Sequence, residues 1–267
     1  MRKKIGDLDI NYEVDGSGPP IVLVHGGGAD LICWEEMVPH LVRDFTVYRF
    51  DQRGFGETQR PAKPVVSLAL WTQDLLNFID AFGLESPALA GWSLGGSVIL
   101  NFACEHPTRC GAAIPIGCPG PKKVVFDKSG FVKRQELADR GLSIEEIIDQ
   151  TFDFTRAAFS QWSRDENPGS LEKIRAMLCR NSAGDYAEMV AAFDQLSDFG
   201  EKLPRLRART LILCGDEDGR TPPNLSEAIH ERLPGSQLAI IPDCGHYCPY
   251  EKPAETSALI RDFLKAS

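Results

Sequence analysis

The chain has 267 residues, of which 43% are hydrophobic and 25% charged, a composition typical of folded globular proteins rather than disordered, collagen-like or coiled-coil chains. Its 29 basic and 38 acidic side chains give a net charge of −9, which disfavours binding to the phosphate backbone of nucleic acids. No apolar run exceeds five residues, whereas a membrane-spanning helix needs roughly 20. We therefore expect a protein that binds neither nucleic acid nor membranes.

The N-terminal residues and the cysteines bear on the cellular compartment. Three early basic residues are not followed by an apolar stretch, so we expect no secretory signal and a cytoplasmic location. In that setting the eight cysteines favour reduced, mostly buried thiols over disulfides. The sequence predicts no cofactor, and nothing in it assigns an oligomeric state.

The order of apolar segments predicts the fold class. Residues 3–14 alternate apolar and polar side chains around a Gly6-Asp7 turn, which predicts two short strands. Six apolar runs follow that are typical of buried strands in a parallel sheet. These runs are 21–24, 45–50, 88–90, 112–116, 211–214 and 238–241. Helical spacing between them, as over 70–82, predicts an α/β fold with a mostly parallel central sheet flanked by helices.

The strand–helix alternation stops between residues 119 and 204. Four helical patterns occupy this stretch, at 131–140, 143–160, 170–180 and 185–198. We expect residues 1–118 and 205–267 to form the core domain, and residues 119–204 to form an inserted helical cap, or lid, at the edge of the sheet.

A sharp turn follows the predicted strand at 88–90. The segment Gly91-Trp-Ser-Leu-Gly95 leads from that strand into a helical run that includes Val98. A serine on such a turn has strained backbone angles, and its neighbours two positions away on either side must lack a Cβ atom. The turn lifts the Ser93 hydroxyl above the sheet and directs a helix N-terminus toward it, which stabilises developing negative charge. The alternative interpretation is a glycine-rich helix entry in which Ser93 is only a cap.

Three further loops follow predicted strands and therefore lie at the same edge of the sheet, where open α/β sheets bind ligands. His25-Gly-Gly-Gly28 leaves backbone N–H groups unobstructed, as an oxyanion hole requires, although it can also be a plain flexible loop. Cys214-Gly-Asp-Glu-Asp218 supplies a carboxylate that can orient a histidine. Asp243-Cys-Gly-His246 supplies the histidine.

Zinc is an alternative role for the last of these loops. Cys244, His246 and Cys248 are residue types that bind zinc. Because the chain has no Cys-x-x-Cys pair and no second cluster, we predict no metal site.

With these motifs in this order, the sequence resembles the α/β-hydrolase fold family over essentially its whole length. The segment Asp51-Gln-Arg-Gly-Phe-Gly56 looks like the family's D-x-R-G-x-G loop, which we expect to be structural. The resemblance implies that Ser93 is the nucleophile, His246 the general base and Asp218 the residue that orients the histidine. Asp218 is favoured over Asp216 because it matches the family's G-x-x-D-x-x-x-P loop.

The same resemblance implies an oxyanion hole. The backbone N–H groups of Gly27 and of Leu94, the residue after the nucleophile, are expected to bind the oxyanion. His25 is expected to brace its loop rather than to act as a second base.

Serine at position 93 excludes the family's haloalkane dehalogenases and epoxide hydrolases, which carry aspartate there. The chain is most similar to small bacterial esterases and 3-oxoadipate enol-lactonases, through residues 174–178, 184–187 and 221–223. It departs from many such lactonases, which carry Asn-Ser-Leu-Gly in place of His25-Gly-Gly-Gly28. We expect hydrolysis of a small carboxylic ester or lactone through an acyl-enzyme. The alternatives are a carbon–carbon bond hydrolase of a ring-cleavage pathway, a haloperoxidase-type perhydrolase and a ligand receptor that retains the triad.

Aromatic side chains are concentrated in the predicted cap, which indicates a modest apolar pocket. Nine of the 23 Phe, Trp and Tyr residues fall between positions 119 and 200. We take Trp92, Phe152, Phe159 and Trp162 as candidates for binding the substrate. The competing interpretation is that helix-spaced aromatics only pack the cap onto the core.

Overall fold

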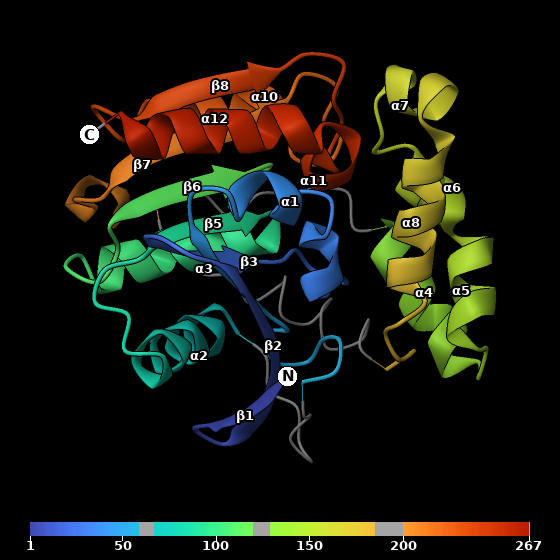
Figure 1. The fold of residues 1–267 in the computed structure, drawn as a ribbon. Coiled ribbons are helices and arrows are strands. Elements are labelled where there is room, and N and C mark those ends of the chain that lie inside the picture. Colours follow the sequence, from blue (N-terminus) through green and yellow to red (C-terminus); the bar gives the residue numbers. More distant parts are fainter. Residues whose placement is uncertain (59–66, 120–128, 185–199, 267) are drawn as a thin grey trace.

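A single eight-stranded sheet runs through the protein (Figure 1). The computed structural model describes residues 1–58, 67–119, 129–184 and 200–266. The strands are β1 (Arg2–Ile5), β2 (Leu8–Gly16), β3 (Pro20–Val24), β4 (Thr46–Phe50), β5 (Ala88–Trp92), β6 (Ala112–Ile116), β7 (Arg209–Gly215) and β8 (Gln237–Ile241). Their order in the sheet is β1-β2-β4-β3-β5-β6-β7-β8. The predicted N-terminal strand pair and all six apolar runs are thus confirmed as strands.

The sheet is mostly parallel, as predicted. β1 pairs antiparallel with β2, and β2 pairs antiparallel with β4, whereas every pairing from β4 through β3 to β8 is parallel. The register keeps the strand ends level, with Val24 beside Gly91 and Gly215 beside Ile241. The loops that leave these strands therefore start at one edge of the sheet.

β8 differs from its prediction as a buried strand. It is the last strand of the sheet, and Ile240 is 38% exposed. An edge strand has a neighbour on one side only, so the apolar run 238–241 is partly solvent-accessible.

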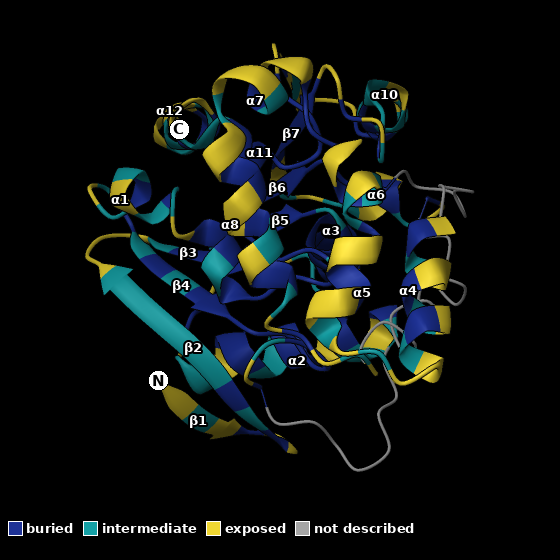
Figure 2. Ribbon diagram, turned by 90° about the vertical axis from the view of Figure 1, so that its right-hand side faces the viewer, coloured by how far each residue is buried: buried dark blue, intermediate teal, exposed yellow. Residues whose placement is uncertain are grey.

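Helices cover both faces of the sheet. The helices outside the inserted region are η1 (Leu31–Trp34), α1 (Val38–Leu41), α2 (Leu68–Ala81), α3 (Leu94–Glu105), η2 (Leu203–Arg205), α10 (Pro223–His230), α11 (Cys248–Glu251) and α12 (Pro253–Lys265). Figure 2 shows α1 and α12 on one side of the sheet and α2, α3 and α10 on the other. Every residue of α3 from Leu94 to Cys104 is buried, so this helix is the centre of the core.

Between β6 and β7, five α-helices of the described residues form a separate layer beside the strand ends (Figure 1). They are α4 (Ser129–Asp139), α5 (Ile144–Gln150), α6 (Phe152–Arg156), α7 (Gln161–Glu166) and α8 (Pro168–Leu178). We refer to residues 129–178 as the cap. The arrowheads of β6 and β8 point toward it, so the cap faces the carboxyl ends of the parallel strands.

The predicted single helix over 143–160 is wrong. The chain forms α5, breaks at Thr151, forms α6 and then turns before α7. The Thr151 hydroxyl donates to the carbonyl of Ile147 and accepts a hydrogen bond from the buried Arg134 of α4. The break therefore follows from packing between cap helices, which a local pattern does not reveal. The predicted helix over 185–198 lies outside the described residues.

Two further expectations concern cysteines and membranes. All eight cysteines are free, and all but the half-buried Cys179 are buried, which confirms the prediction of buried thiols. Among the helices of the described residues, none has the length and apolar character required to span a membrane.

Candidate active site

Ser93 lies on a strained turn between β5 and α3. Its backbone angles are φ 53° and ψ −117°, a conformation that residues other than glycine rarely adopt. A Cβ atom on Gly91 would lie 2.3 Å from the carbonyl oxygen of Gly95, and one on Gly95 would lie 2.0 Å from that of Val24. These distances show why both positions flanking the serine are glycine, as the motif predicts.

A chain of hydrogen bonds joins Ser93, His246 and Asp218. The Ser93 Oγ lies 3.1 Å from His246 Nε2, and His246 Nδ1 lies 2.9 Å from Asp218 Oδ2. The three residues come from loops that follow β5, β8 and β7 respectively. In this arrangement the imidazole can accept the serine proton while the carboxylate holds the opposite ring nitrogen.

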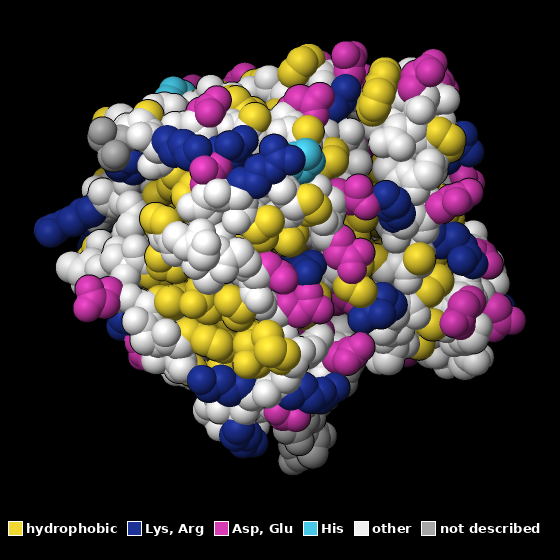
Figure 3. Space-filling view, viewed as in Figure 1, with side chains coloured by type: hydrophobic (Ala, Val, Ile, Leu, Met, Phe, Trp, Pro, Cys, Tyr) yellow, Lys and Arg dark blue, Asp and Glu magenta, His cyan; other side chains and the backbone are white. Residues whose placement is uncertain are grey.

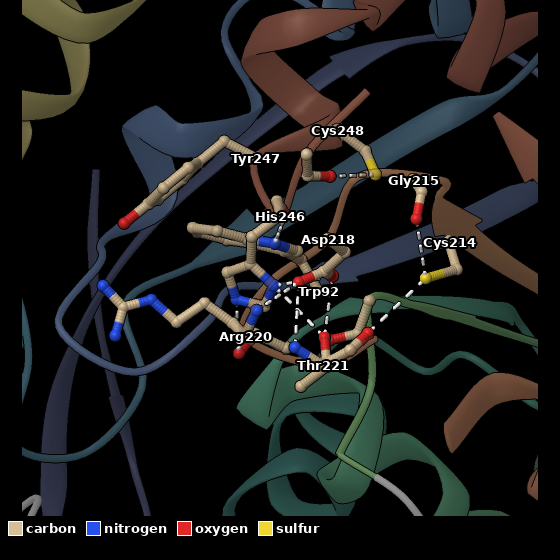
Figure 4. Close-up of polar contacts among 12 residues, drawn as sticks. Trp92, Cys214, Gly215, Asp218, Arg220, Thr221, His246, Tyr247 and Cys248 are labelled. Atoms are coloured by element: carbon tan, nitrogen blue, oxygen red, sulfur yellow. Dashed lines mark hydrogen bonds and ion pairs between the residues drawn. The ribbon is translucent and has the colours of Figure 1, made fainter. Parts of the chain in front are cut away.

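In the loop after β7, Asp218 is the aspartate that lies against the histidine. The side chain of Asp218 is fully buried, whereas Asp216 and Asp243 are exposed. Asp218 Oδ1 accepts the backbone N–H groups of Arg220 and Thr221, each at 2.8 Å (Figure 4). Asp216 instead accepts the N–H of Cys244 at 3.2 Å.

Thr221 is a site residue to which the sequence interpretation gave no role. Its hydroxyl lies 2.8 Å from Asp218 Oδ2, 2.8 Å from the carbonyl oxygen of Gly117 and 3.2 Å from His246 Nδ1. It therefore fixes the carboxylate oxygen that meets the histidine. The signal in the sequence is its position, three residues after Asp218 and directly before Pro222.

The glycine loop after β3 lies against the serine. A Cβ atom on Gly26 would lie 3.2 Å from the Cβ of Ser93, and Gly27 lines the same cavity as Ser93. Leu94 is the first residue of α3, and the first N–H groups of a helix have no partner within it. The N–H of Leu94 and the Gly27 loop therefore both lie next to Ser93, and their role as an oxyanion hole stays a prediction.

His25 braces this loop. Its fully buried ring lies with Nδ1 2.8 Å from the carbonyl oxygen of Gly26, and its Nε2 accepts the backbone N–H of Gln52 at 2.9 Å. Burial lowers the pKa of His25, although Asp51 opposes the shift. The neutral ring, with Nδ1 donating and Nε2 accepting, satisfies both contacts.

The side chains of the loop at 51–56 bond to other segments of the protein. Asp51 accepts hydrogen bonds from the backbone N–H groups of Leu31 and Glu57 and from the side chain of Asn11. Arg53 forms a buried, two-pronged ion pair with Asp74 at 2.7 and 2.8 Å. These bonds tie together segments that are distant in the sequence.

Ser93 and His246 open into a cavity between the sheet edge and the cap. Its volume is about 630 Å³, including the part that is open to solvent. The described residues that line it are Gly27, Trp92, Ser93, Pro119, Phe131, Arg134, Phe154, Met177, Leu178, Arg220, Thr221, His246 and Tyr247.

One of the four predicted substrate-binding residues lines this cavity. Trp92 does, and its indole N–H also donates to the carbonyl of His246 at 2.8 Å. Phe152 packs against the core, and Phe159 is buried in a stack with Tyr247. Trp162 is 37% exposed and has the ammonium of Lys252 3.7 Å from its ring centroid.

Two other aromatic residues occupy the places that the prediction gave to Phe152 and Phe159. Phe131 and Phe154 line the cavity and meet edge to face, with ring centroids 5.3 Å apart. Phe154 lies directly on the backbone of Gly130, where a Cβ atom would overlap its ring. A shift of two residues along α6 separates Phe152 from Phe154, and the sequence alone does not fix which one faces inward.

Two arginines also line the cavity, and the sequence interpretation did not single out either. Arg134 is buried and donates to the hydroxyls of Thr151 at 2.9 Å and Thr155 at 2.6 Å. Arg220 extends away from the Asp218 cluster (Figure 4), and its guanidinium lies 3.3 Å from the centroid of the Phe154 ring. The cavity wall opposite the sheet is therefore both aromatic and cationic.

The possible zinc ligands have other partners. The ring nitrogens of His246 face Ser93 and Asp218, and the thiols of Cys244 and Cys248 each lie 3.6 Å from the carbonyl oxygen of Gly245. In the part of the chain that the structure describes, no three His, Cys, Asp or Glu side chains are arranged to hold a metal.

The fold and these loops define an α/β enzyme with a serine, a histidine and an aspartate at the carboxyl edge of a parallel sheet. The sequence model of the "Alpha/beta hydrolase family" matches residues 21–259. The chain belongs to this family, and its activity class is that of a hydrolase.

Individual relatives have several hydrolytic activities. The chain is 28% identical over 270 residues to the 2-hydroxy-6-oxo-2,4-heptadienoate hydrolase of Pseudomonas putida (strain F1), covering 98% of this chain and 94% of that protein. A thermophilic esterase from Thermogutta terrifontis, solved with malate bound, has a TM-score of 0.88 at 28% identity, over 99% and 98% of the two chains. The enol-lactonase from Burkholderia xenovorans LB400 shares the fold with a TM-score of 0.87 at 22% identity, over 99% and 100%.

Proposed function

We propose that the protein is a serine hydrolase that cleaves a small carboxylic ester or lactone through an acyl-enzyme. The observation that carries this proposal is the hydrogen-bonded chain from Asp218 through His246 to Ser93, which ends in a cavity. If Asp218 and His246 formed only a structural ion pair, there would be no need for a serine on a strained turn beside His246 Nε2.

The proposed reaction has two halves. Ser93 Oγ attacks the carbonyl carbon while its proton passes to His246 Nε2, and the carbonyl oxygen becomes an anion held by the N–H groups of Gly27 and Leu94. The proton on His246 then passes to the departing alkoxide, which leaves an ester on Ser93. In the second half His246 takes a proton from water, the hydroxide attacks the acyl carbon, and the proton returns to Ser93. Asp218 keeps the imidazole in the tautomer that accepts at Nε2.

The two arginines suit an acyl group that carries a carboxylate. Guanidinium groups bind carboxylates, and Arg134 and Arg220 place two positive charges on the cavity wall. Each also donates hydrogen bonds within the protein, Arg134 to two threonine hydroxyls and Arg220 to the carbonyl of Phe154. The Pseudomonas relative acts on a compound named as a carboxylate, and the Thermogutta esterase was solved with malate, a dicarboxylate. We therefore propose anionic substrates, with the carboxylate at the cap side of the scissile carbonyl.

A carbon–carbon bond hydrolase is the second candidate. It is favoured by the similarity to the heptadienoate hydrolase, which extends over 98% of this chain. Such a reaction also adds water across a bond next to a carbonyl group, and it would use the same serine, histidine and cavity.

A substrate panel tests the proposal. Purified protein is assayed with p-nitrophenyl esters, small lactones and 2-hydroxy-6-oxo-dienoates, with Ser93→Ala as the blank. Multiple turnovers on esters or lactones that disappear in Ser93→Ala support the proposal, and turnover confined to the dienoates supports the second candidate. A single slow turnover with a ligand-dependent shift in melting temperature would instead indicate a receptor.

Charge selectivity is tested with two esters of equal length, p-nitrophenyl hemiglutarate and p-nitrophenyl pentanoate. Arg220→Met keeps an unbranched side chain, shorter than arginine, and removes the charge. A charged hydrogen bond contributes about 1.5–3 kcal/mol, so we expect kcat/KM to fall about 10- to 150-fold for the hemiglutarate and within about threefold for the pentanoate. Arg156→Met, on the exposed face of α6, is the control. Equal losses on both esters would contradict carboxylate binding by Arg220.

A further inference from the structure

Glu251 is a buried acid next to the proposed catalytic histidine, and the mechanism above gives it no role. It ends α11 and is 2% exposed. Its Oε2 accepts the backbone N–H of Gly245 at 3.0 Å, and its Oε1 accepts that of Tyr247 at 3.0 Å. One carboxylate thus binds the residues directly before and after His246.

The same carboxylate also reaches the cap. Glu251 Oε2 accepts the backbone N–H of Ser160 at 2.9 Å, and Ser160 is the residue that caps the N-terminus of α7. One side chain therefore holds three N–H groups, two from the histidine loop and one from the cap.

The histidine loop and the cap also touch directly. The backbone N–H of His246 itself donates to the carbonyl of Ala158 at 2.7 Å. A Cβ atom on Gly245 would lie 2.4 Å from that carbonyl oxygen and 2.6 Å from the N of Ser160. Phe159, between them, stacks on Tyr247 with ring centroids 4.5 Å apart. There is no free space between the two segments.

These contacts fix the backbone of His246 from both directions. Its N–H is held by the cap, its carbonyl oxygen accepts the indole N–H of Trp92 at 2.8 Å, and its two neighbours are held by Glu251. A carboxylate accepts all three of its N–H partners without competition, because it has four acceptor sites and no donor.

We propose that Glu251 is a positioning residue for hydrolysis, which couples the cap segment 158–160 to the His246 loop so that the seating of the cap sets the position of the imidazole. This inference rests on the proposed function, because it requires His246 to be the general base. Part of the cap then holds the residue that moves the proton, so the cap acts on the chemical step as well as on the choice of substrate.

Glu251→Gln tests the coupling. The amide keeps one acceptor oxygen and puts an NH2 donor where the second oxygen stood. A backbone N–H that bonded to that oxygen then faces another donor, and its hydrogen bond is lost. Because misplacement of a reacting group by about 1 Å can cost 100-fold, we expect kcat for p-nitrophenyl acetate to fall about 10- to 100-fold with KM within about threefold. Acetate is too small to depend on pocket contacts with the cap. We also expect the proton NMR signal of His246 Nδ1–H to shift, because its hydrogen bond to Asp218 changes.

Asp74→Asn is the matched control. It also replaces a buried carboxylate by an amide, but Asp74 bonds to Arg53. We expect it to lower the melting temperature and leave both kcat for the acetate and the NMR signal unchanged. If Asp74→Asn changes kcat and the signal as Glu251→Gln does, the effect is one of general stability and the proposal is wrong.

A second variant tests the link without altering the acid. Gly245→Ala forces the His246 loop away from Ala158 and Ser160, and we expect the same loss in kcat and the same change in the NMR signal. The proposal is overturned if both variants keep wild-type kcat on the acetate, or if they lose activity only on substrates long enough to reach the cap. Failure of the proposed function has a different signature, namely full activity in Ser93→Ala or His246→Ala.

Discussion

At the scale of single residues, three aspartates compete to orient the histidine, and hydrogen-bonding geometry distinguishes them. Asp218 is fully buried and 2.9 Å from His246 Nδ1, while Asp216 and Asp243 are exposed. Asp243 adopts a positive φ of 51°, so its backbone makes the turn that leads to the histidine. The sequence argument from the G-x-x-D-x-x-x-P spacing selects the same residue as the contacts do.

We therefore expect Asp218→Asn to lower kcat about 10³- to 10⁴-fold. The amide can donate to His246 Nδ1 and so favours the tautomer whose Nε2 carries a proton and is unable to accept one from Ser93. Steady-state kinetics on one ester measures this loss.

Asp216→Asn and Asp243→Asn are the controls and should cost tenfold or less, through loop geometry alone. The assignment of Asp218 fails if it tolerates the change to asparagine while Asp216→Asn abolishes turnover.

The sequence predicts much of the site because the residues concerned lie at fixed distances along the chain from predicted strands. The elbow glycines, the acid and the histidine occupy fixed places after strands, and a parallel sheet brings those places together. Thr221, Arg134 and Arg220 escape such reasoning because their roles depend on contacts between segments that are distant in the chain. The same holds for Glu251, whose partners include a residue 91 positions away.

At the scale of elements, different parts of the cap make different contacts. Phe131 and Phe154 face the cavity from α4 and α6, whereas Trp162 on α7 is covered by Lys252 at the surface. The turn at 157–160 between them holds the histidine loop. A helical pattern extends through 143–160 in the sequence, but residues 158 and 160 contact the histidine loop from a turn, and α6 ends at Arg156.

This division gives a prediction for substrate preference. Phe154→Ala removes a ring from the cavity wall and from beneath Arg220, so we expect kcat/KM for a hexanoate ester to fall about 10-fold or more relative to the acetate ester. The ratio of the two kcat/KM values, measured side by side, reports the change.

Trp162→Ala serves as the comparison, since it deletes an aromatic side chain of the cap that does not line the cavity. We expect the hexanoate-to-acetate ratio to stay within about twofold of wild type. A larger change in Trp162→Ala than in Phe154→Ala would mean that substrates contact the outer surface of the cap.

At the scale of the whole molecule, the surface charges and the order of the strands can be compared with the sequence. Acidic and basic side chains are interspersed over the face shown in Figure 3. The order of the six parallel strands along the chain was predictable because continuous apolar runs mark strands buried on both faces. Their order across the sheet was not, because pairing is decided by contacts between distant segments.

His25 links the stability of the whole fold to pH. Burial lowers its pKa from the ordinary value of 6.5, with Asp51 and Asp30 opposing the shift. Below pH 6.5 the unfolded chain therefore binds a proton that the folded imidazole does not, and the free energy of unfolding falls as the pH falls. Above pH 6.5 both states hold a neutral ring, and His25 contributes no pH dependence.

We expect His25→Gln to remove this dependence. The glutamine oxygen can accept the N–H of Gln52 that the ring nitrogen accepts, and it does not titrate. We expect the variant to be less stable than wild type at pH 7.5, since it loses the contacts of the ring with Gly26 and Phe55. As the pH falls below about 6.5, the difference in unfolding free energy narrows by up to about 1.4 kcal/mol per pH unit. Urea denaturation of both proteins at pH 5.5, 6.5 and 7.5 measures the difference, and a constant gap across that range would mean that His25 titrates alike in the folded and unfolded chains.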